Sequence, residues 1–171
     1  MLAVLALLSY LFLYTPLKRR TPLCTLVGAF PGAMPPLIGW AAASGRLSLE
    51  AWVLFAMLFV WQFPHFMAIA WLYREDYDRA GYLVLPCGQR RIRFMAWQSV
   101  LPALALIPLS LIPVLLGSAG PVYMVGALLL GSYFFYCAAQ LAFRHSNAVA
   151  RRLLFASIIY LPFVFVLMVL D

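Results

Sequence analysis

The chain has 171 residues, of which 66% are hydrophobic and only 10% are charged, and its mean hydropathy is +0.97. This composition excludes a water-soluble domain, because a domain of this size could not hide so much apolar surface from water. The net charge of +7 would suit a nucleic-acid-binding protein, but the distribution of the charges indicates a membrane protein, so no nucleic-acid partner is expected.

Six apolar runs are long enough to form membrane-spanning helices. They cover residues 1–17, 22–43, 49–72, 94–116, 121–143 and 153–170. Helices are expected because backbone polar groups in lipid must form hydrogen bonds within their own segment. The sequence therefore predicts an all-α fold, a polytopic membrane helix bundle with six transmembrane helices.

Basic residues concentrate in alternate connections between these runs. Eleven of the twelve lie in the first, third and fifth connections: Lys18, Arg19, Arg20, Arg74, Arg79, Arg90, Arg91, Arg93, Arg144, Arg151 and Arg152. Arg46 alone falls in an even connection. The positive-inside rule then predicts cytoplasmic basic loops and both chain ends outside. The chain is expected to be a multi-pass protein of the cell inner membrane, with the lipid bilayer as a partner and the mitochondrial inner membrane less favoured.

The second run is irregular, because GAFPGAMPP (residues 28–36) contains three prolines and two glycines. Proline inside a helix removes a hydrogen bond and bends the axis, and glycines four residues apart permit close helix packing. Two interpretations follow: a kinked packing helix, or a helix bent to widen a cavity in the bundle.

His65 lies within the third run, roughly 10 Å below the membrane interface at 1.5 Å per residue. A lone histidine is usually satisfied by a neighbouring residue, but an ionisable group at this depth faces the bundle interior or a cavity. Haem iron is one target for a neutral imidazole. Trp61, one turn earlier, is too deep to be an interfacial anchor.

An acidic loop, YREDYDRAG (residues 73–81), is expected to continue the third run as a short helix. Two pairs in it are spaced for i,i+4 ion pairs: Arg74 with Asp78, and Glu75 with Arg79. Asp76 has Ala80 at the corresponding position, so we expect its carboxylate to be free. A free carboxylate at a membrane-cavity mouth could bind Mg²⁺, which takes one or two carboxylates together with substrate phosphates.

Lys18, Arg19 and Arg20 lie on the same predicted side as Asp76. They act as a topology signal, and they could also bind phosphate, which guanidinium groups grip in a bidentate manner.

Four segments resemble the protoheme IX farnesyltransferase (haem O synthase) family of the UbiA superfamily of intramembrane prenyltransferases. They are YTPLKR (residues 14–19), GAFPGAMPPLIGW (28–40), WQFPHF (61–66) and REDYDRAGYLVLP (74–86). WQFPHF followed by DY-x-x-AG is specific to the haem O branch, and the likeness covers most of the chain.

The resemblance implies a bundle of about nine helices around a central cavity that opens to the cytoplasm. It implies transfer of a farnesyl group from farnesyl diphosphate to a vinyl group of haem b, giving haem O and diphosphate, with Mg²⁺ as cofactor and haem b as substrate. Asp76 would hold the metal and, with Lys18 and Arg19, form the catalytic set. The residues implied to bind substrate are His65, Arg74, Tyr77, Asp78, Trp61 and Gln62.

The chain departs from the family at its first aspartate motif, N-x-x-x-D-x-x-x-D, because no acidic residue precedes Glu50. We therefore expect a single transmembrane prenyltransferase domain over residues 1–171 that lacks the first three helices and this motif. Haem A synthase or a separate N-terminal fragment is the expected protein partner.

Two other functions stay open. A UbiA-type prenyltransferase with an aromatic acceptor fits the same fold, although WQFPHF argues against it. A six-helix half of a transporter would show a 3+3 repeat with sites near the midplane, and no such repeat stands out.

Overall fold

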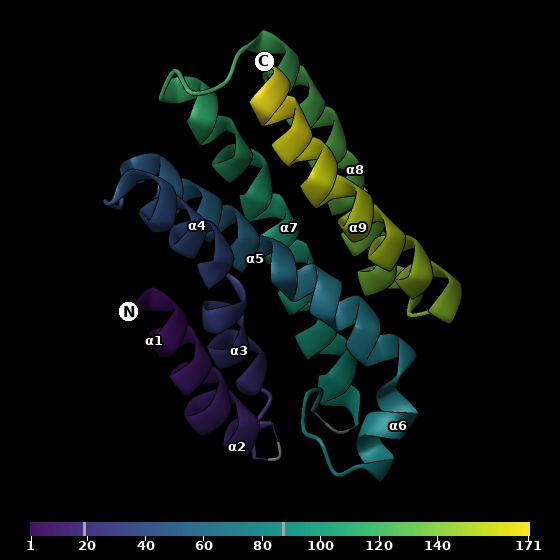
Figure 1. Ribbon diagram of the computed structural model, residues 1–171. Helices are drawn as coiled ribbons and strands as arrows, with labels where there is room; N and C mark the ends of the chain where they lie inside the picture. Colours follow the sequence, from purple (N-terminus) through teal and green to yellow (C-terminus); the bar gives the residue numbers. More distant parts are fainter. Residues whose placement is uncertain (19, 87) are drawn as a thin grey trace.

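The computed structural model describes residues 1–18, 20–86 and 88–171, and every regular element in these ranges is helical (Figure 1). Arg19, one of the predicted phosphate-binding residues, lies outside them. In chain order the elements are α1 (Leu2–Leu8), η1 (Ser9–Tyr14), α2 (Thr15–Leu17), α3 (Cys24–Gly32), α4 (Met34–Ser44), α5 (Leu49–Leu72), α6 (Arg74–Arg79), α7 (Gln89–Leu115), α8 (Pro121–Arg144) and α9 (Asn147–Leu170).

Five helical stretches among the described residues are long and apolar enough to cross a membrane: Cys24–Ser44, Leu49–Leu72, Arg90–Leu115, Pro121–Arg144 and Asn147–Leu170. The first predicted run is also helical, but as a shorter apolar stretch, Leu2–Leu17. The predicted all-α polytopic bundle is confirmed, with five helices of spanning length and this shorter one.

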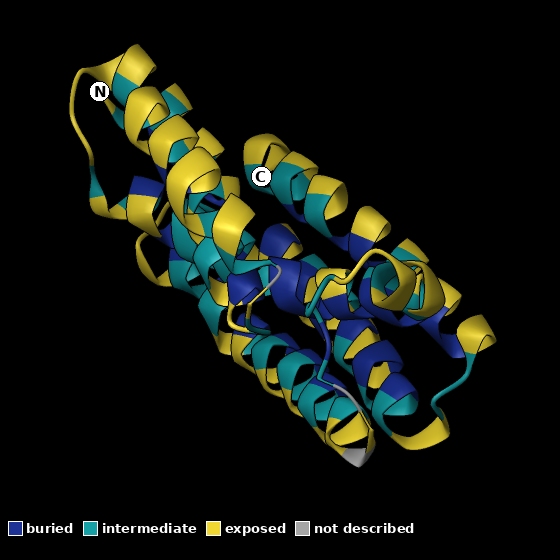
Figure 2. Cartoon of the chain, turned by 90° about the horizontal axis from the view of Figure 1, so that it is seen from below, coloured by how far each residue is buried: buried dark blue, intermediate teal, exposed yellow. Residues whose placement is uncertain are grey.

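The main core lies where α5, α7, α8 and α9 face one another. Its fully buried side chains include Met57, Met67, Leu106, Phe134 and Tyr160. Seen from below, buried residues follow the inner faces of the helices and exposed ones outline the outside (Figure 2). The N-terminal helices pack on the other side of α5, so α5 is the wall shared by both halves.

The predicted irregularity of the second run is a break between α3 and α4 at Ala33, whose φ is −92° and ψ is −3°. Pro35 and Pro36 have no N–H to donate to the carbonyls of Pro31 and Gly32, so the helical ladder cannot continue through this turn. Both interpretations of the motif are compatible with the break, because Gly32 packs against α5 and also lines a cavity.

The connections that carry the basic residues gather at one end of the bundle. The ends of α2, α5 and α8 and the starts of α7 and α9 lie there, together with α6, whereas the turn from α4 to α5 lies at the opposite end (Figure 1). This common end is what the alternation of charge predicts. Which side of a membrane it faces stays a prediction.

Candidate functional site

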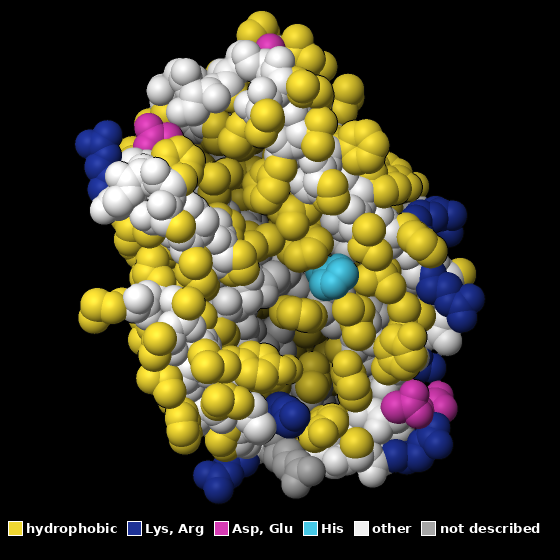
Figure 3. Space-filling view, viewed as in Figure 1, with side chains coloured by type: hydrophobic (Ala, Val, Ile, Leu, Met, Phe, Trp, Pro, Cys, Tyr) yellow, Lys and Arg dark blue, Asp and Glu magenta, His cyan; other side chains and the backbone are white. Residues whose placement is uncertain are grey.

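A cavity of about 610 Å³ lies between the N-terminal helices, α3, α5 and α6. We call it the tyrosine pocket. The residues that line it include Tyr10, Tyr14, Thr25, Gly28, Gly32, Gln62 and Tyr77. Its volume falls in the range of about 300–1,000 Å³ that is typical of small-molecule sites. Figure 3 shows the face on which it opens: apolar side chains surround a hollow, and charged side chains gather at the lower end.

One wall of the pocket is the π-helical turn η1. Pro16 has no N–H for the carbonyl of Phe12, so an α-helical ladder cannot run through this turn, and the Thr15 hydroxyl donates to the Tyr10 carbonyl at 3.0 Å. Single π turns inside α-helices often occur at functional sites. A side chain at Gly28 would meet the Tyr14 ring at 2.6 Å, so glycine there is what lets α3 lie against this ring.

Gln62 joins the two long walls of the pocket. Its side chain is 4% exposed, and its amide nitrogen donates to the Ala29 carbonyl at 3.1 Å and to the Leu58 carbonyl at 3.0 Å. Its carbonyl oxygen lies directly against Gly32, where a Cβ would collide with it. Gln62 therefore holds α3 to α5 and lies on the pocket wall, while its contact to substrate stays a prediction.

Lys18, Tyr82 and the pocket-lining Tyr77 form a chain of contacts that we call the mouth of the pocket. The Lys18 ammonium lies 4.9 Å from the centre of the Tyr82 ring, and Tyr82 packs edge-on against Tyr77 at 6.2 Å. The Lys18 carbonyl also accepts a hydrogen bond from the Leu83 N–H at 2.9 Å, which ties the loop after α6 to the end of α2. Burial raises the pKa of the Tyr77 phenol, so it is neutral at physiological pH. Among the described residues, the mouth thus includes the Lys18 ammonium and the uncharged Tyr77 hydroxyl.

The acidic loop differs from the expectation at several points. The chain breaks at Tyr73, so α6 is a separate six-residue helix rather than a continuation of α5. The predicted i,i+4 ion pairs do not form. The pairs that the structure shows are Arg74 with Glu75 at 3.6 Å, Arg79 with Asp76 at 3.1 Å and Arg91 with Asp78 at 2.8 Å. Other partners compete for these side chains: Asn147 on α9 binds Arg74, Arg91 on α7 binds Asp78, and Asp76 binds Arg79.

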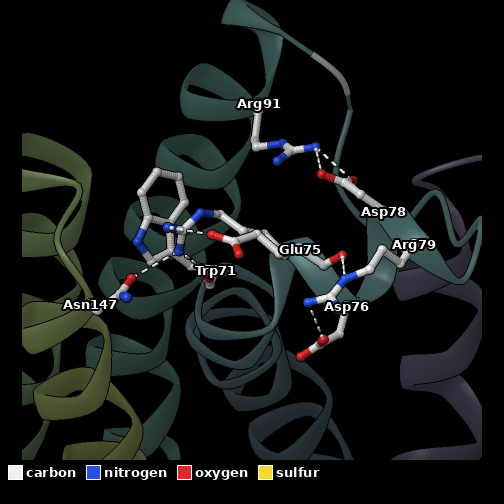
Figure 4. A network of polar contacts seen from close by, with 8 residues as sticks. Trp71, Glu75, Asp76, Asp78, Arg79, Arg91 and Asn147 are labelled. Atoms are coloured by element: carbon white, nitrogen blue, oxygen red, sulfur yellow. Dashed lines mark hydrogen bonds and ion pairs between the residues drawn. The ribbon is translucent and has the colours of Figure 1, made fainter.

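The expectation of a free Asp76 carboxylate is therefore wrong. Arg79, three residues later, pairs with it at the surface, where the Asp76 side chain is 62% exposed (Figure 4). Among the described residues no group of three or more histidines, cysteines or carboxylates could hold a metal ion. Asp76 can offer one exposed oxygen ligand, and any further ligands of a metal there would come from substrate and water.

Asp78, shown in Figure 4, and Arg74 are both occupied by contacts within the protein. Both Asp78 oxygens accept from Arg91, at 2.8 and 3.0 Å, and Arg91 also donates to the Pro86 carbonyl. Arg74 donates to the Trp71 carbonyl at 2.7 Å and to Asn147 on α9 at 2.9 Å. Through these contacts the two predicted substrate-binding residues hold α6 against α7 and α9, and their contact with substrate stays a prediction.

His65 and Trp61 lie on a different face of α5, turned towards α9. Their rings stack at 4.7 Å, the Trp61 indole donates to the Ser157 carbonyl at 3.0 Å, and His65 Nδ1 is 2.8 Å from the Ser157 hydroxyl. That hydroxyl donates its one proton to the Leu154 carbonyl at 2.6 Å, so it accepts from Nδ1–H. The geometry thus selects the tautomer in which Nε2 carries the lone pair.

Nε2 of His65 has no hydrogen-bond partner in the part of the chain that the structure describes. It is also not among the fully buried polar atoms that lack a partner, so it is accessible at the protein surface. It is therefore open to an external ligand. The side chain does not line the tyrosine pocket, but its ring is 5.8 Å from that of Phe66, which does.

The predicted residues thus fall into three groups. Lys18, Gln62 and Tyr77 belong to the tyrosine pocket and its mouth, Trp61 and His65 to the face towards α9, and Arg74, Asp76 and Asp78 to the α6 network. Tyr10 and Tyr14 were missed, although Tyr14 opens the YTPLKR motif. Ser157 was missed because it lies 92 residues from His65 and no local pattern marks it.

Comparisons with known proteins agree with these features. The UbiA prenyltransferase family matches residues 1–160. The chain is 56% identical over 165 residues to a protoheme IX farnesyltransferase from Solibacter usitatus, covering 96% of this chain and 56% of that protein. It is 49% identical to the enzyme of that name from Koribacter versatilis, over 99% of this chain and 57% of the relative, and 43% identical to that from Cytophaga hutchinsonii, over 99% and 59%.

The chain therefore spans little more than half the length of these relatives. No solved structure matches it. The resemblance that the motifs indicate is confirmed: the chain belongs to the UbiA prenyltransferase family.

Proposed function

We propose that this chain forms part of an enzyme that transfers a farnesyl group from farnesyl diphosphate to a vinyl group of haem b, giving haem O and diphosphate. The observation that carries the proposal is the His65–Ser157 contact, which fixes an imidazole with an open Nε2 on the helix that also lines the tyrosine pocket. The names of the relatives support the same reaction.

The tyrosine pocket is the proposed site for farnesyl diphosphate. Its wall is mostly apolar and suits an isoprenoid chain, and its mouth presents the Lys18 ammonium to the diphosphate. Lys18 has no acidic partner within the described ranges, so its charge is available to an anion. Tyr77 is neutral and can donate a hydrogen bond to a phosphate oxygen without repelling it.

Asp76 is the proposed ligand for Mg²⁺. Asp76 offers one exposed carboxylate, and its present partner, Arg79, is itself on the surface. Mg²⁺ binds proteins in this way, through one or two carboxylates with phosphate and water completing the shell. When bound, the ion would neutralise charge on the leaving diphosphate.

In the reaction the C1–O bond of farnesyl diphosphate breaks, and diphosphate leaves with the electron pair. Lys18 stabilises the negative charge that develops on the leaving oxygen. The apolar pocket wall excludes water from the allylic cation until the vinyl π electrons of haem b form the new carbon–carbon bond. Water then adds to the resulting cation and loses a proton, which yields the hydroxyl group of haem O.

His65 is the proposed contact for haem b, with Nε2 directed to the iron. Ser157 orients the ring from the other nitrogen, as partners of metal-bound histidines commonly do. Trp61 stacks on the same imidazole and restricts its rotation. We also propose that the end of the bundle bearing the basic loops and α6 faces the cytoplasm of a bacterial cell.

Titration of the purified chain with haem b, followed by the Soret absorbance, tests the haem site. His65→Ala is expected to abolish the ligation spectrum, and Ser157→Ala to weaken binding by about 10- to 100-fold. Ser110→Ala is the matched control, because Ser110 is equally buried and its hydroxyl donates only to the Ile107 carbonyl. An unchanged haem affinity in His65→Ala would remove this residue from the site.

The acceptor is tested separately, in membranes of a bacterium that lacks its own protoheme IX farnesyltransferase and expresses this chain. Haem O formed from haem b and farnesyl diphosphate supports the proposal. Prenylation of a hydroxybenzoate in place of haem b would assign the site to an aromatic acceptor.

A further inference from the structure

A second groove, of about 690 Å³, lies along the start of α7 at the basic end of the bundle. We call it the arginine groove, and it is lined by Pro86, Arg90, Arg93, Phe94, Trp97 and Gln98. None of these residues lines the tyrosine pocket, so the proposed reaction makes no use of them.

The two arginines of this groove are unused within the protein. Arg91 between them is committed to Asp78 and to the Pro86 carbonyl. Arg90 and Arg93, in contrast, are exposed and have neither an ion pair nor a hydrogen bond to any residue that the structure describes. One turn apart on the same helix, they present two guanidinium groups to one ligand. Guanidinium groups bind phosphate oxygens in a bidentate manner.

An apolar groove continues from the arginine groove towards the middle of the bundle. It has a volume of about 220 Å³, shares Gln98 with the arginine groove, and is lined by Pro22, Leu23, Leu26, Phe59, Phe63 and Pro102. Pro102 lies nine residues after Arg93, about 14 Å further along α7 at 1.5 Å per residue. This distance is roughly half of a hydrocarbon core of about 30 Å, so the groove runs from Pro22 and Leu23, just before the spanning stretch Cys24–Ser44, to the depth of acyl chains at Pro102.

Trp97 marks the boundary between the two regions. Its side chain is 58% exposed although it belongs to a membrane-spanning helix, and it lies one turn below Arg93. Exposed tryptophan side chains concentrate at the level of the lipid head groups. Arginine, tryptophan and apolar groove thus follow one another in the order of phosphate, interface and hydrocarbon.

We propose that the two grooves together bind one anionic phospholipid, with its phosphate between Arg90 and Arg93 and one acyl chain in the apolar groove. The charge complementarity favours an anionic over a zwitterionic head group, because the groove offers two cations and no described carboxylate. Basic sites between membrane helices on the positively charged side recognise anionic head groups in this way. Farnesyl diphosphate shares this chemistry, but the protein already presents Lys18 and the tyrosine pocket to it.

The test compares dioleoyl phosphatidylglycerol with dioleoyl phosphatidylcholine on the detergent-purified chain, with bound lipid measured by native mass spectrometry. Arg90→Gln/Arg93→Gln is expected to weaken phosphatidylglycerol binding by about 25-fold, since each basic residue near an anionic surface contributes roughly fivefold. Phosphatidylcholine binding is expected to change little. The matched control is Arg144→Gln/Arg151→Gln, which removes two exposed charges at the same end but outside the groove.

A second measurement uses the unaltered protein. Phosphatidylglycerol with a photoreactive group in its acyl chain is expected to label the residues around Phe59 and Leu26. Equal binding of the two lipids, equal losses in the two double variants, or labelling that avoids this groove would each overturn the proposal. Displacement of phosphatidylglycerol by farnesyl diphosphate would also overturn it, and would make the groove a prenyl diphosphate site.

Discussion

Gly32 and Gln62 form the contact on which the shape of the tyrosine pocket depends, and their replacement offers a quantitative test. In Gly32→Ala the new methyl group would collide with the Gln62 side-chain oxygen. The Gln62 side chain cannot easily move away, because its amide nitrogen donates hydrogen bonds to the Ala29 and Leu58 carbonyls. Overpacking of this kind costs about 1–3 kcal/mol. In Gln62→Ala the interhelical bond to the Ala29 carbonyl is lost and a cavity remains, at a cost of about 1–2 kcal/mol.

The double variant distinguishes this contact from two independent defects. With alanine at position 62, the methyl group at position 32 enters the space that the amide has left. The double variant is therefore expected to be no less stable than Gln62→Ala alone. The coupling energy is then about 1 kcal/mol or more, opposite in sign to the cost of Gly32→Ala.

The assay is the rate at which a maleimide dye labels Cys24, which is 1% exposed and begins α3. Cys87 is replaced by serine in every variant, and Cys137, buried in α8, reports on the main core. A cost of 1–3 kcal/mol raises the population of the opened state, and so the labelling rate of Cys24, by about 5- to 150-fold. Labelling of Cys137 is expected to change less, because α3 does not contribute to its core.

Gly39→Ala is the matched control, because a Cβ at that helical glycine meets nothing within 4 Å. It is expected to leave the rate unchanged or to lower it slightly, since alanine has the higher helix propensity. If the costs of Gly32→Ala and Gln62→Ala simply add in the double variant, the two residues do not press on each other and the reasoning fails.

Two further predictions concern the mouth of the pocket, and a third concerns the α6 network. Lys18→Gln is expected to weaken the binding of inorganic pyrophosphate about tenfold, as measured by calorimetry. Arg46→Gln, at the opposite end of the bundle, is the control and is expected to have no effect. Equal losses in the two variants would mean that only the net charge of the protein matters. Since burial raises the pKa of Tyr77 above 10, the neutral phenol stabilises the fold below pH 10, and this contribution is lost as the pH rises further. The thermal midpoint should therefore fall less in Tyr77→Phe than in the unaltered protein between pH 9 and about pH 11.5, and parallel curves would contradict this account. Asp78→Asn is expected to lower the free energy of unfolding by about 1 kcal/mol, because the Asp78 side of its bidentate pair with Arg91 is half exposed. Thermal unfolding measures this loss. A double-mutant cycle with Arg91→Gln that shows no coupling would refute the pairing.

The sequence predicted the parts of the fold that depend on local pattern. Apolar length located the spanning helices, and the prolines of residues 31–36 located the break at Ala33. Charge alternation predicted that the basic connections share one end, because each span reverses the direction of the chain.

The α6 network could not be predicted because its partners come from other helices. The i,i+4 rule assumes an uninterrupted helix, but the break at Tyr73 leaves a six-residue helix whose side chains reach outwards. Asp78 pairs with Arg91 on α7, and Arg74 donates a hydrogen bond to Asn147 on α9. The orientation of His65 depends likewise on Ser157, which only the folded chain brings near.

The break at Ala33 also bears on how the protein enters its membrane during synthesis. α3 has 9 residues and α4 has 11, so at 1.5 Å per residue the two pieces are about 14 and 17 Å long. Neither crosses a hydrocarbon layer of about 30 Å alone, but joined end to end they do. We therefore expect α3 and α4 to enter the lipid together, as one arm of a hairpin whose other arm is α5. A charged substitution in α4 would then be expected to keep α3 out of the membrane as well. A single change in α4 would therefore remove the whole span Cys24–Ser44.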